Sequence, residues 1–289
     1  MIDVVVQPVT FTNGTTWVVA SYTPPNSKWL MTKMIGVLCG CFGVVISFLA
    51  IHFIYRFFAL ERKGRLVHFK GKKVIIWLSI PFICGVLWGS ISYYCFKPTS
   101  FSDHYISENV LPEYNATLKS ITYLAVIYFD KHGNYSKIHW IGIILLILMM
   151  EISLFIVCYF AIRNYLLIKK LTKSSGHSKF TKKLQSQLYT ALIAQTLIPT
   201  LLMYIPVGSF FVFPMFDVDI KRYTKYLIYS YALYPSIDPI PLICIVDDYR
   251  IAFFQVLLYI PYAILTPKPN KVNTEPASRL SVSARSRSQ

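Results

Sequence analysis

The sequence predicts an all-α fold, namely a polytopic bundle of transmembrane helices. Its 289 residues are 55% hydrophobic and 15% charged, whereas a typical soluble domain has about 25% charged residues. The mean hydropathy is +0.49, and the apolar residues gather in blocks long enough to cross a bilayer. The net charge of +16 comes from Lys and Arg residues between these blocks. This arrangement favours a lipid bilayer over a nucleic acid as the partner.

The first predicted span is 34–55, a run of 22 residues without a formal charge. A helix rises about 1.5 Å per residue, so this run is long enough to cross a hydrocarbon core about 30 Å thick. The span is followed by Arg56 and a basic segment. We therefore expect Tyr55 and Arg56 at one membrane surface. Arg56 is either an interfacial anchor or a switch whose contacts differ between two packings of the bundle.

Four more apolar blocks have spanning length. They are 74–96, 138–162, 188–214 and 226–246. The predicted organisation is an extracellular segment 1–33, a bundle over 34–250, and a final segment 251–289. The apolar part of that final segment is short and contains a proline, which favours a position along the membrane interface. The rest is rich in Pro, Ser and Arg and is expected to be a disordered cytoplasmic tail.

The distribution of basic residues predicts the orientation of the bundle. Segments 56–73, 163–183 and 250–289 hold 20 of the 29 Lys and Arg residues, which places them in the cytosol by the positive-inside rule. The N-terminus is then outside and the C-terminus is cytoplasmic. Three Asn-x-Ser/Thr glycosylation patterns, which begin at Asn13, Asn115 and Asn134, all fall in segments assigned to the outside.

Polar residues inside the predicted spans are candidate functional residues, because a charge in hydrocarbon is costly. Glu151 interrupts the third span, and we expect it to face the bundle, either contacting a ligand or linking helices. Asp238 and Pro239 lie in a proline-rich part of the fifth span that must bend. Asp238 either binds an ion or proton or satisfies freed backbone groups. Gln195 and Pro199 place an amide beside a predicted kink that acts as a hinge or a simple bend.

No enzymatic motif appears in the chain. The sequence has no Gly-x-Ser-x-Gly elbow, no His-Glu-x-x-His pair and no glycine-rich phosphate loop. Its six cysteines form no Cys-x-x-Cys pair and no metal-ligand spacing with histidine. We therefore expect neither an enzyme, nor a cofactor, nor a metal site.

Three stretches resemble a known family. They are HFIYRFFAL at 52–60, KLQSQLYTALIAQTLIPTLLMYIP at 183–206 and LYPSIDPIPLICIVDDYR at 233–250. Their residues and their order along the chain resemble the motifs of the nematode seven-transmembrane chemoreceptors of the Str superfamily, in the Str or Srj class. The resemblance implies a receptor for odorants or other small molecules that couples to a heterotrimeric G protein. It also implies the plasma membrane of a sensory neuron, including its sensory cilium, as the location.

The resemblance assigns roles to individual residues. Arg56, preceded by Tyr55, would match the arginine at the cytoplasmic end of the family's third helix, which faces the G protein. Asp238 and Pro239 would match the bend of the seventh helix, and Tyr249 and Arg250 would close that helix at the inner face. The five spans then correspond to helices three to seven, with the first two helices absent.

Two other functions are open at this point. One is a non-signalling remnant of the family. The other is an ion- or proton-coupled transporter that uses Glu151 and Asp238 as its sites.

Overall fold

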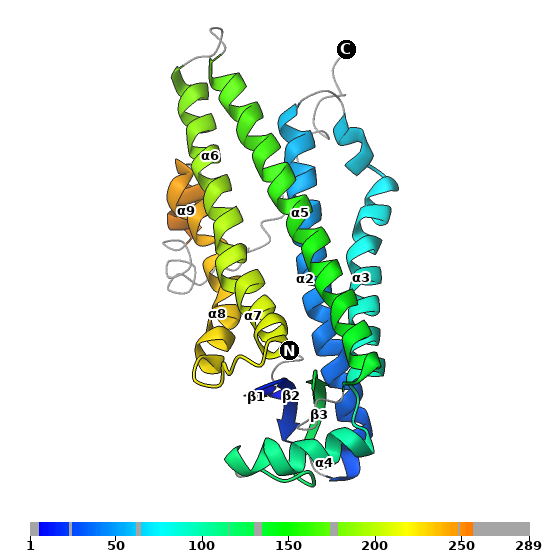
Figure 1. The fold of residues 1–289 in the computed structure, drawn as a ribbon. Helices are drawn as coiled ribbons and strands as arrows, with labels where there is room; N and C mark the ends of the chain where they lie inside the picture. The colour runs from blue at the N-terminus through cyan, green and yellow to red at the C-terminus, as the bar shows by residue number, and fades with distance from the viewer. Residues whose placement is uncertain are drawn as a thin grey trace, which may run out of the picture. The chain divides into compact units, whose positions relative to one another are not determined.

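The computed structural model of the chain describes residues 6–22, 25–61, 65–114, 116–129, 135–173, 179–247 and 249–256. The chain divides into two compact units, Met1–Val246 and Asp247–Gln289. The first unit contains the helix bundle and a small sheet (Figure 1). The second unit is described only at 247 and 249–256, so the predicted tail lies largely outside the described residues.

The predicted polytopic all-α bundle is confirmed. Within the described ranges, four helical segments are long and apolar enough to cross a membrane. Three are single helices: α2 (Lys28–Glu61), α3 (Lys73–Phe96) and α5 (Lys137–Lys173). The fourth is a continuous run of α6 (Lys179–Pro199), the π-helix η4 (Thr200–Tyr204) and α7 (Ile205–Met215). Figure 1 shows these helices running alongside one another, with α2, α3 and α5 forming one group.

The predicted fifth span is divided rather than continuous. It forms α8 (Thr224–Ile237) and α9 (Ile240–Ile245), which are separated at Asp238 and Pro239. Pro239 has no N–H to donate to the carbonyl four residues earlier, and its ring crowds the preceding turn, so the helix ends there. Neither piece alone has the length of a transmembrane helix.

A three-stranded antiparallel sheet, which the sequence analysis did not predict, lies at one end of the bundle. Its strands, in the order β1-β2-β3, are β1 (Val9–Asn13), β2 (Thr16–Tyr22) and β3 (Ile121–Ile127). Gly14, with φ of +48°, allows the tight turn between β1 and β2. Figure 1 shows the sheet and α4 (Ser100–Asn109) at the end where α2 and α5 begin.

Short 3₁₀ turns complete the connections. They are η1 (Pro25–Ser27), η2 (Arg65–Phe69) and η3 (Leu111–Tyr114).

The sheet forms a layer between α4 and the bundle. Every residue of β3 is buried, and its side chains alternate between the two sides. Tyr123 and Ala125 belong to a cluster with Ile106 of α4, whereas Leu124 and Val126 belong to the main core of the bundle. We call this layer, made of β1, β2, β3 and α4, the cap.

Aromatic contacts and hydrogen bonds hold the cap on α7 and α8. The Trp17 ring lies 5.4 Å from the Phe211 ring, edge to face. The hydroxyl of Tyr128 donates a 2.7 Å hydrogen bond to the Phe211 carbonyl. The hydroxyls of Thr12 and Thr224 are 2.8 Å apart. The cap is therefore attached directly to the helical run that contains η4.

Helices α2 and α3 cross at glycines. A Cβ atom added to Gly40 would lie 2.7 Å from the carbonyl oxygen of Gly85, and one added to Gly89 would lie 2.8 Å from that of Gly36. Small residues at this spacing let two helix backbones approach closely inside a membrane.

Candidate functional site

The candidate site is a cavity beside the C-terminal half of α2, where His52, Gln195 and Asp238 meet among apolar and aromatic side chains. The cavity has a volume of about 330 Å³ and is lined by residues of α2, α6 and α8 and by Asp238. Its lining residues are Val45, Phe48, Leu49, His52, Phe53, Gln195, Tyr234 and Asp238. Two of the polar residues singled out in the sequence, Gln195 and Asp238, therefore meet in one place although they come from different spans.

Arg56 joins this site through a hydrogen bond. Its guanidinium donates to the side-chain oxygen Oε1 of Gln195, which links the end of α2 to α6. Arg56 is partly buried and Gln195 is buried. A charge-assisted hydrogen bond of this kind is stronger than one between neutral groups, and more so away from water.

Gln195 also lies where the helix changes its geometry. Pro199 is four residues further on and has no N–H, so the Gln195 carbonyl loses its usual helical donor. The π-helix η4 begins directly after Pro199. π-helical turns inside α-helices are rare and occur often at functional sites. The residue that holds Arg56 is thus part of the kink itself.

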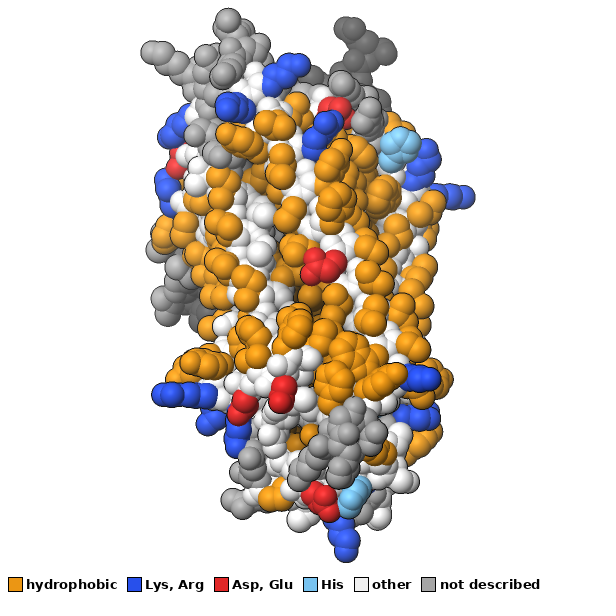
Figure 2. Space-filling view, viewed as in Figure 1, with side chains coloured by type: hydrophobic (Ala, Val, Ile, Leu, Met, Phe, Trp, Pro, Cys, Tyr) orange, Lys and Arg blue, Asp and Glu red, His pale blue; other side chains and the backbone are white. Residues whose placement is uncertain are grey.

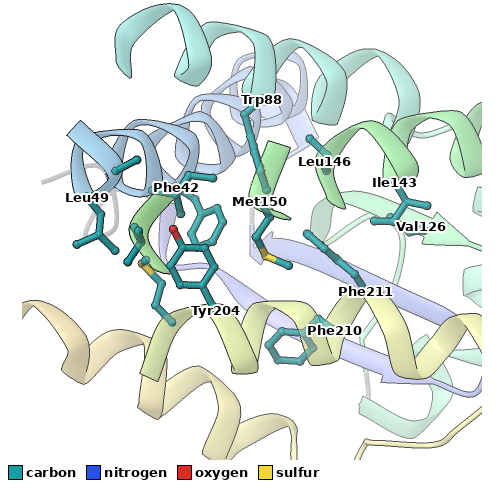
Figure 3. Close-up of a cluster of buried hydrophobic side chains, with 14 of the residues drawn as sticks. Phe42, Leu49, Trp88, Val126, Ile143, Leu146, Met150, Tyr204, Phe210 and Phe211 are labelled. Atoms are coloured by element: carbon teal, nitrogen blue, oxygen red, sulfur yellow. The ribbon is translucent and has the colours of Figure 1, made fainter. Parts of the chain in front are cut away.

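A second buried polar contact lies on the far side of the same kink. The hydroxyl of Ser153 on α5 donates to the backbone carbonyl of Ile46 on α2 at 2.7 Å. The Tyr204 hydroxyl, at the end of η4, lies 2.8 Å from Ser153 and is left to donate to it. Figure 3 shows Tyr204 among the buried side chains of the core, near Phe42 and Met150.

The sequence analysis missed Ser153 and Tyr204. The available signal was a hydroxyl group in an apolar span, since such groups hydrogen-bond across helices in membranes. That signal identifies no partner, because a span of this kind contains several hydroxyl residues.

Glu151 does not face the bundle, so this prediction was wrong. Its side chain is exposed on α5. The buried face of α5 is set by Leu146, Met150, Ser153 and Val157, and a residue one position after Met150 is turned by about 100° from that face. Glu151 does not line the cavity that holds Asp238, which separates the two acids that a transporter mechanism would combine.

Tyr55 does not line the cavity, and two more of the predicted residues belong to the other unit. Tyr55 is exposed, and its ring contacts that of Phe69 edge-on at 5.2 Å. Tyr249 and Arg250 belong to the second unit, in which the Arg250 guanidinium pairs with Asp247.

Of the three predicted glycosylation sites, only Asn13 lies in the described part of the chain. It ends β1 at the tip of the hairpin, and its side-chain nitrogen donates to the Asn109 carbonyl. Asn115 and Asn134 lie outside the described residues.

The cap closes the end of the bundle opposite Arg56. Beneath it is a cavity of only about 20 Å³, lined mainly by apolar and aromatic side chains that include Trp17, Trp88 and Phe211. This volume holds about one water molecule. In the cap, burial and the nearby Asp103 carboxylate, which accepts the Tyr123 hydroxyl at 2.6 Å, raise the pKa of Tyr123. The Tyr123 hydroxyl therefore stays protonated and acts as a hydrogen-bond donor.

No metal centre is found within the ranges that the structure covers, where no three His, Cys, Asp or Glu side chains come close enough to hold an ion.

Comparisons with known proteins agree with this architecture. The family model described as "Serpentine type 7TM GPCR chemoreceptor Str" matches residues 1–254. Serpentine receptor class r-10 of Caenorhabditis elegans is 28% identical over 265 residues, which cover 89% of this chain and 76% of that protein. No solved structure matches the chain.

Two further Caenorhabditis elegans proteins are similar to the chain. G-protein coupled receptor str-33 is 26% identical over 239 residues, covering 80% of this chain and 68% of that protein. G-protein coupled receptor str-217 is 29% identical over 223 residues, covering 76% of this chain and 64% of that protein. Since the family model covers most of its length, the chain belongs to the serpentine seven-transmembrane GPCR chemoreceptor family Str, a family of membrane receptors and not of enzymes.

Proposed function

We propose that the chain transmits the binding of a small molecule near its cap to a heterotrimeric G protein at the opposite end of the bundle. The observation that carries this proposal is the hydrogen bond from Arg56 to Gln195 at the kinked helix. Through this bond a basic residue near the end of α2 contacts α6 just before its π-helical turn η4.

The orientation in the plasma membrane is part of the proposal. The cap end is extracellular, with the N-terminus outside, and the end that carries Arg56 is cytoplasmic, as is the C-terminus. This is supported by the 20 of 29 basic residues in segments 56–73, 163–183 and 250–289. Glycosylation of Asn13 at the hairpin tip, and of Asn115 and Asn134, belongs to the same proposal. A sensory cilium is the proposed destination.

The α6–η4–α7 run connects the two ends. Phe211, which contacts the cap, and Gln195, which holds Arg56, lie 16 residues apart in this run, about 24 Å along a helix. The cavity beneath the cap is small, so a ligand that enters it must move the aromatic side chains that line the cavity. Such a movement of α7 would shift the equilibrium between an Arg56–Gln195 state and a state in which Arg56 is released.

Released Arg56 would be available to the G protein. Tyr55 beside it, and Tyr249 and Arg250 of the second unit, are proposed as further G-protein-facing residues. The break at Asp238 and Pro239 is proposed to let α8 follow the movement of α6, since Asp238 lines the same cavity as Gln195.

The test is nucleotide exchange on a set of heterotrimeric G proteins by the purified chain in lipid vesicles. No ligand is needed, because Gln195→Leu removes the acceptor and should raise basal exchange several-fold. Arg56→Ala should abolish basal nucleotide exchange. The matched control is Thr196→Val, one residue along, because the Thr196 hydroxyl bonds only the Leu192 carbonyl of its own helix. Equal exchange by Gln195→Leu and Thr196→Val would refute the switch.

A further inference from the structure

Glu151 lies near the middle of a membrane-spanning helix, where contact between a carboxyl group and lipid is unfavourable. The candidate span in α5 runs over Lys137–Lys170, so Glu151 lies about 21 Å and about 28 Å from its two ends. A glutamate side chain is too short to reach either membrane surface from there. The side chain is exposed, and it makes no hydrogen bond or ion pair with any residue in the described part of the chain. Figure 2 shows an acidic side chain surrounded by hydrophobic ones about half-way along the bundle.

Exposed residues line α5 on both sides of Glu151 along the chain. We call seven of them the α5 seam: Ile141, Ile144, Leu148, Glu151, Phe155, Cys158 and Ile162. They follow one another at steps of three and four, so a second helix laid along α5 would meet all of them over several turns. Glu151 is the middle member of the seam.

Membrane geometry selects the partner. All copies of a membrane protein cross the bilayer in one direction, so the twofold axis of a pair lies along the membrane normal. Equivalent residues of the two copies are then at the same depth. We propose that two copies of this chain associate through the α5 seam, with the two Glu151 side chains facing each other.

In the pair, each Glu151 side chain gains a hydrogen-bond partner that the described residues of a single copy do not provide. When at least one proton is shared between the two carboxyl groups, the O–H of one donates to an oxygen of the other, and no covalent bond changes. Polar side chains in a membrane are commonly satisfied across helices in this way. Phe155, the most exposed large hydrophobic residue of the seam at 70%, lies one turn from Glu151 and would be covered in the pair. The inference requires only that α5 crosses a bilayer, and it is independent of ligand binding and of G-protein coupling.

The first test uses the cysteine of the seam. Cys158 is exposed and lies two turns after Glu151, so in the pair it faces Cys158 of the second copy. A chain that keeps Cys158 alone among its six cysteines is reconstituted in phosphatidylcholine vesicles and oxidised with copper phenanthroline. A disulfide forms only when the two Cα atoms approach to about 4.4–6.8 Å. We expect several times more covalent dimer than from a chain that keeps only Cys41, which is exposed on α2.

The second test measures association directly, by energy transfer between labelled copies at a series of protein-to-lipid ratios. Glu151→Leu should weaken association by about tenfold, whereas Glu151→Gln should retain it, because two amides also hydrogen-bond. Both variants should fold, since the side chain points away from the core. Association unchanged by Glu151→Leu would overturn the proposal. So would Cys158 cross-linking no better than Cys41, or Cys158 linking to other membrane proteins and never to a second copy.

Discussion

Gly40 provides a sharp test of how α2 and α3 pack. In Gly40→Ala the new methyl group would lie 2.7 Å from the Gly85 carbonyl oxygen, whereas a relaxed contact of this kind is about 3.3 Å or longer. The obstacle is backbone, so it cannot rotate away, and the two helices must separate by about half an ångström. Overpacking of this size typically costs about 1–3 kcal/mol.

Gly208→Ala is the matched control. Its methyl group would meet only the end of the flexible Met150 side chain, at 3.5 Å. Both changes gain the same helix preference of alanine over glycine, about 1 kcal/mol in water, so the difference between them isolates the packing cost. Thermal unfolding of each variant in detergent, followed by circular dichroism, should place the Tm of Gly40→Ala about 2–12 °C below that of Gly208→Ala.

Equal Tm values for the two variants would refute the close approach of α2 and α3. A lower Tm for Gly208→Ala would refute it equally, because the packing at α7 would then be the tighter of the two. A third variant, Gly40→Val, extends the series, since a larger side chain at the same point should lower the Tm further.

Three more outcomes are expected. Ser153→Ala should lower the free energy of unfolding by about 1–3 kcal/mol in a detergent denaturation series, because it leaves the buried Tyr204 hydroxyl without its acceptor and removes the bond from α5 to the Ile46 carbonyl of α2. Unaltered stability would show that the Ser153 contact is dispensable. Trp17→Ala removes the ring that contacts α7 and should speed hydrogen exchange in β1 and β2, with little change in α5. Uniform exchange across the chain would contradict a separately attached cap. Expression in animal cells should give a mobility shift that glycosidase removes and that Asn13→Gln reduces; a chain with no attached sugar would contradict the proposed orientation.

Features that depend on neighbouring residues along the chain could be predicted before the structure was known. An uncharged run of 22 residues becomes a membrane helix wherever it packs, as 34–55 does within α2. Pro199 and Pro239 remove backbone donors whatever surrounds them, so a disturbance of the helix was predictable at both points; a π-helical turn follows Pro199, and α8 ends at Ile237, just before Pro239. The three family motifs are also local, which is why family membership could be recognised before any packing was known.

Which faces of the helices meet could not be predicted in the same way, because it depends on how the helices pack. In a membrane the lipid is as apolar as the protein core, so hydrophobic periodicity does not separate an inward face from an outward one. Glu151 was predicted to face the bundle because a charge in hydrocarbon is costly, and its exposure followed only from the packing of α5. The same reason hid the bond between Arg56 and Gln195, which are 139 residues apart. The cap was hidden as well, because β3 pairs with β2, about 100 residues earlier in the chain, and such pairing depends on which segments the helices bring together.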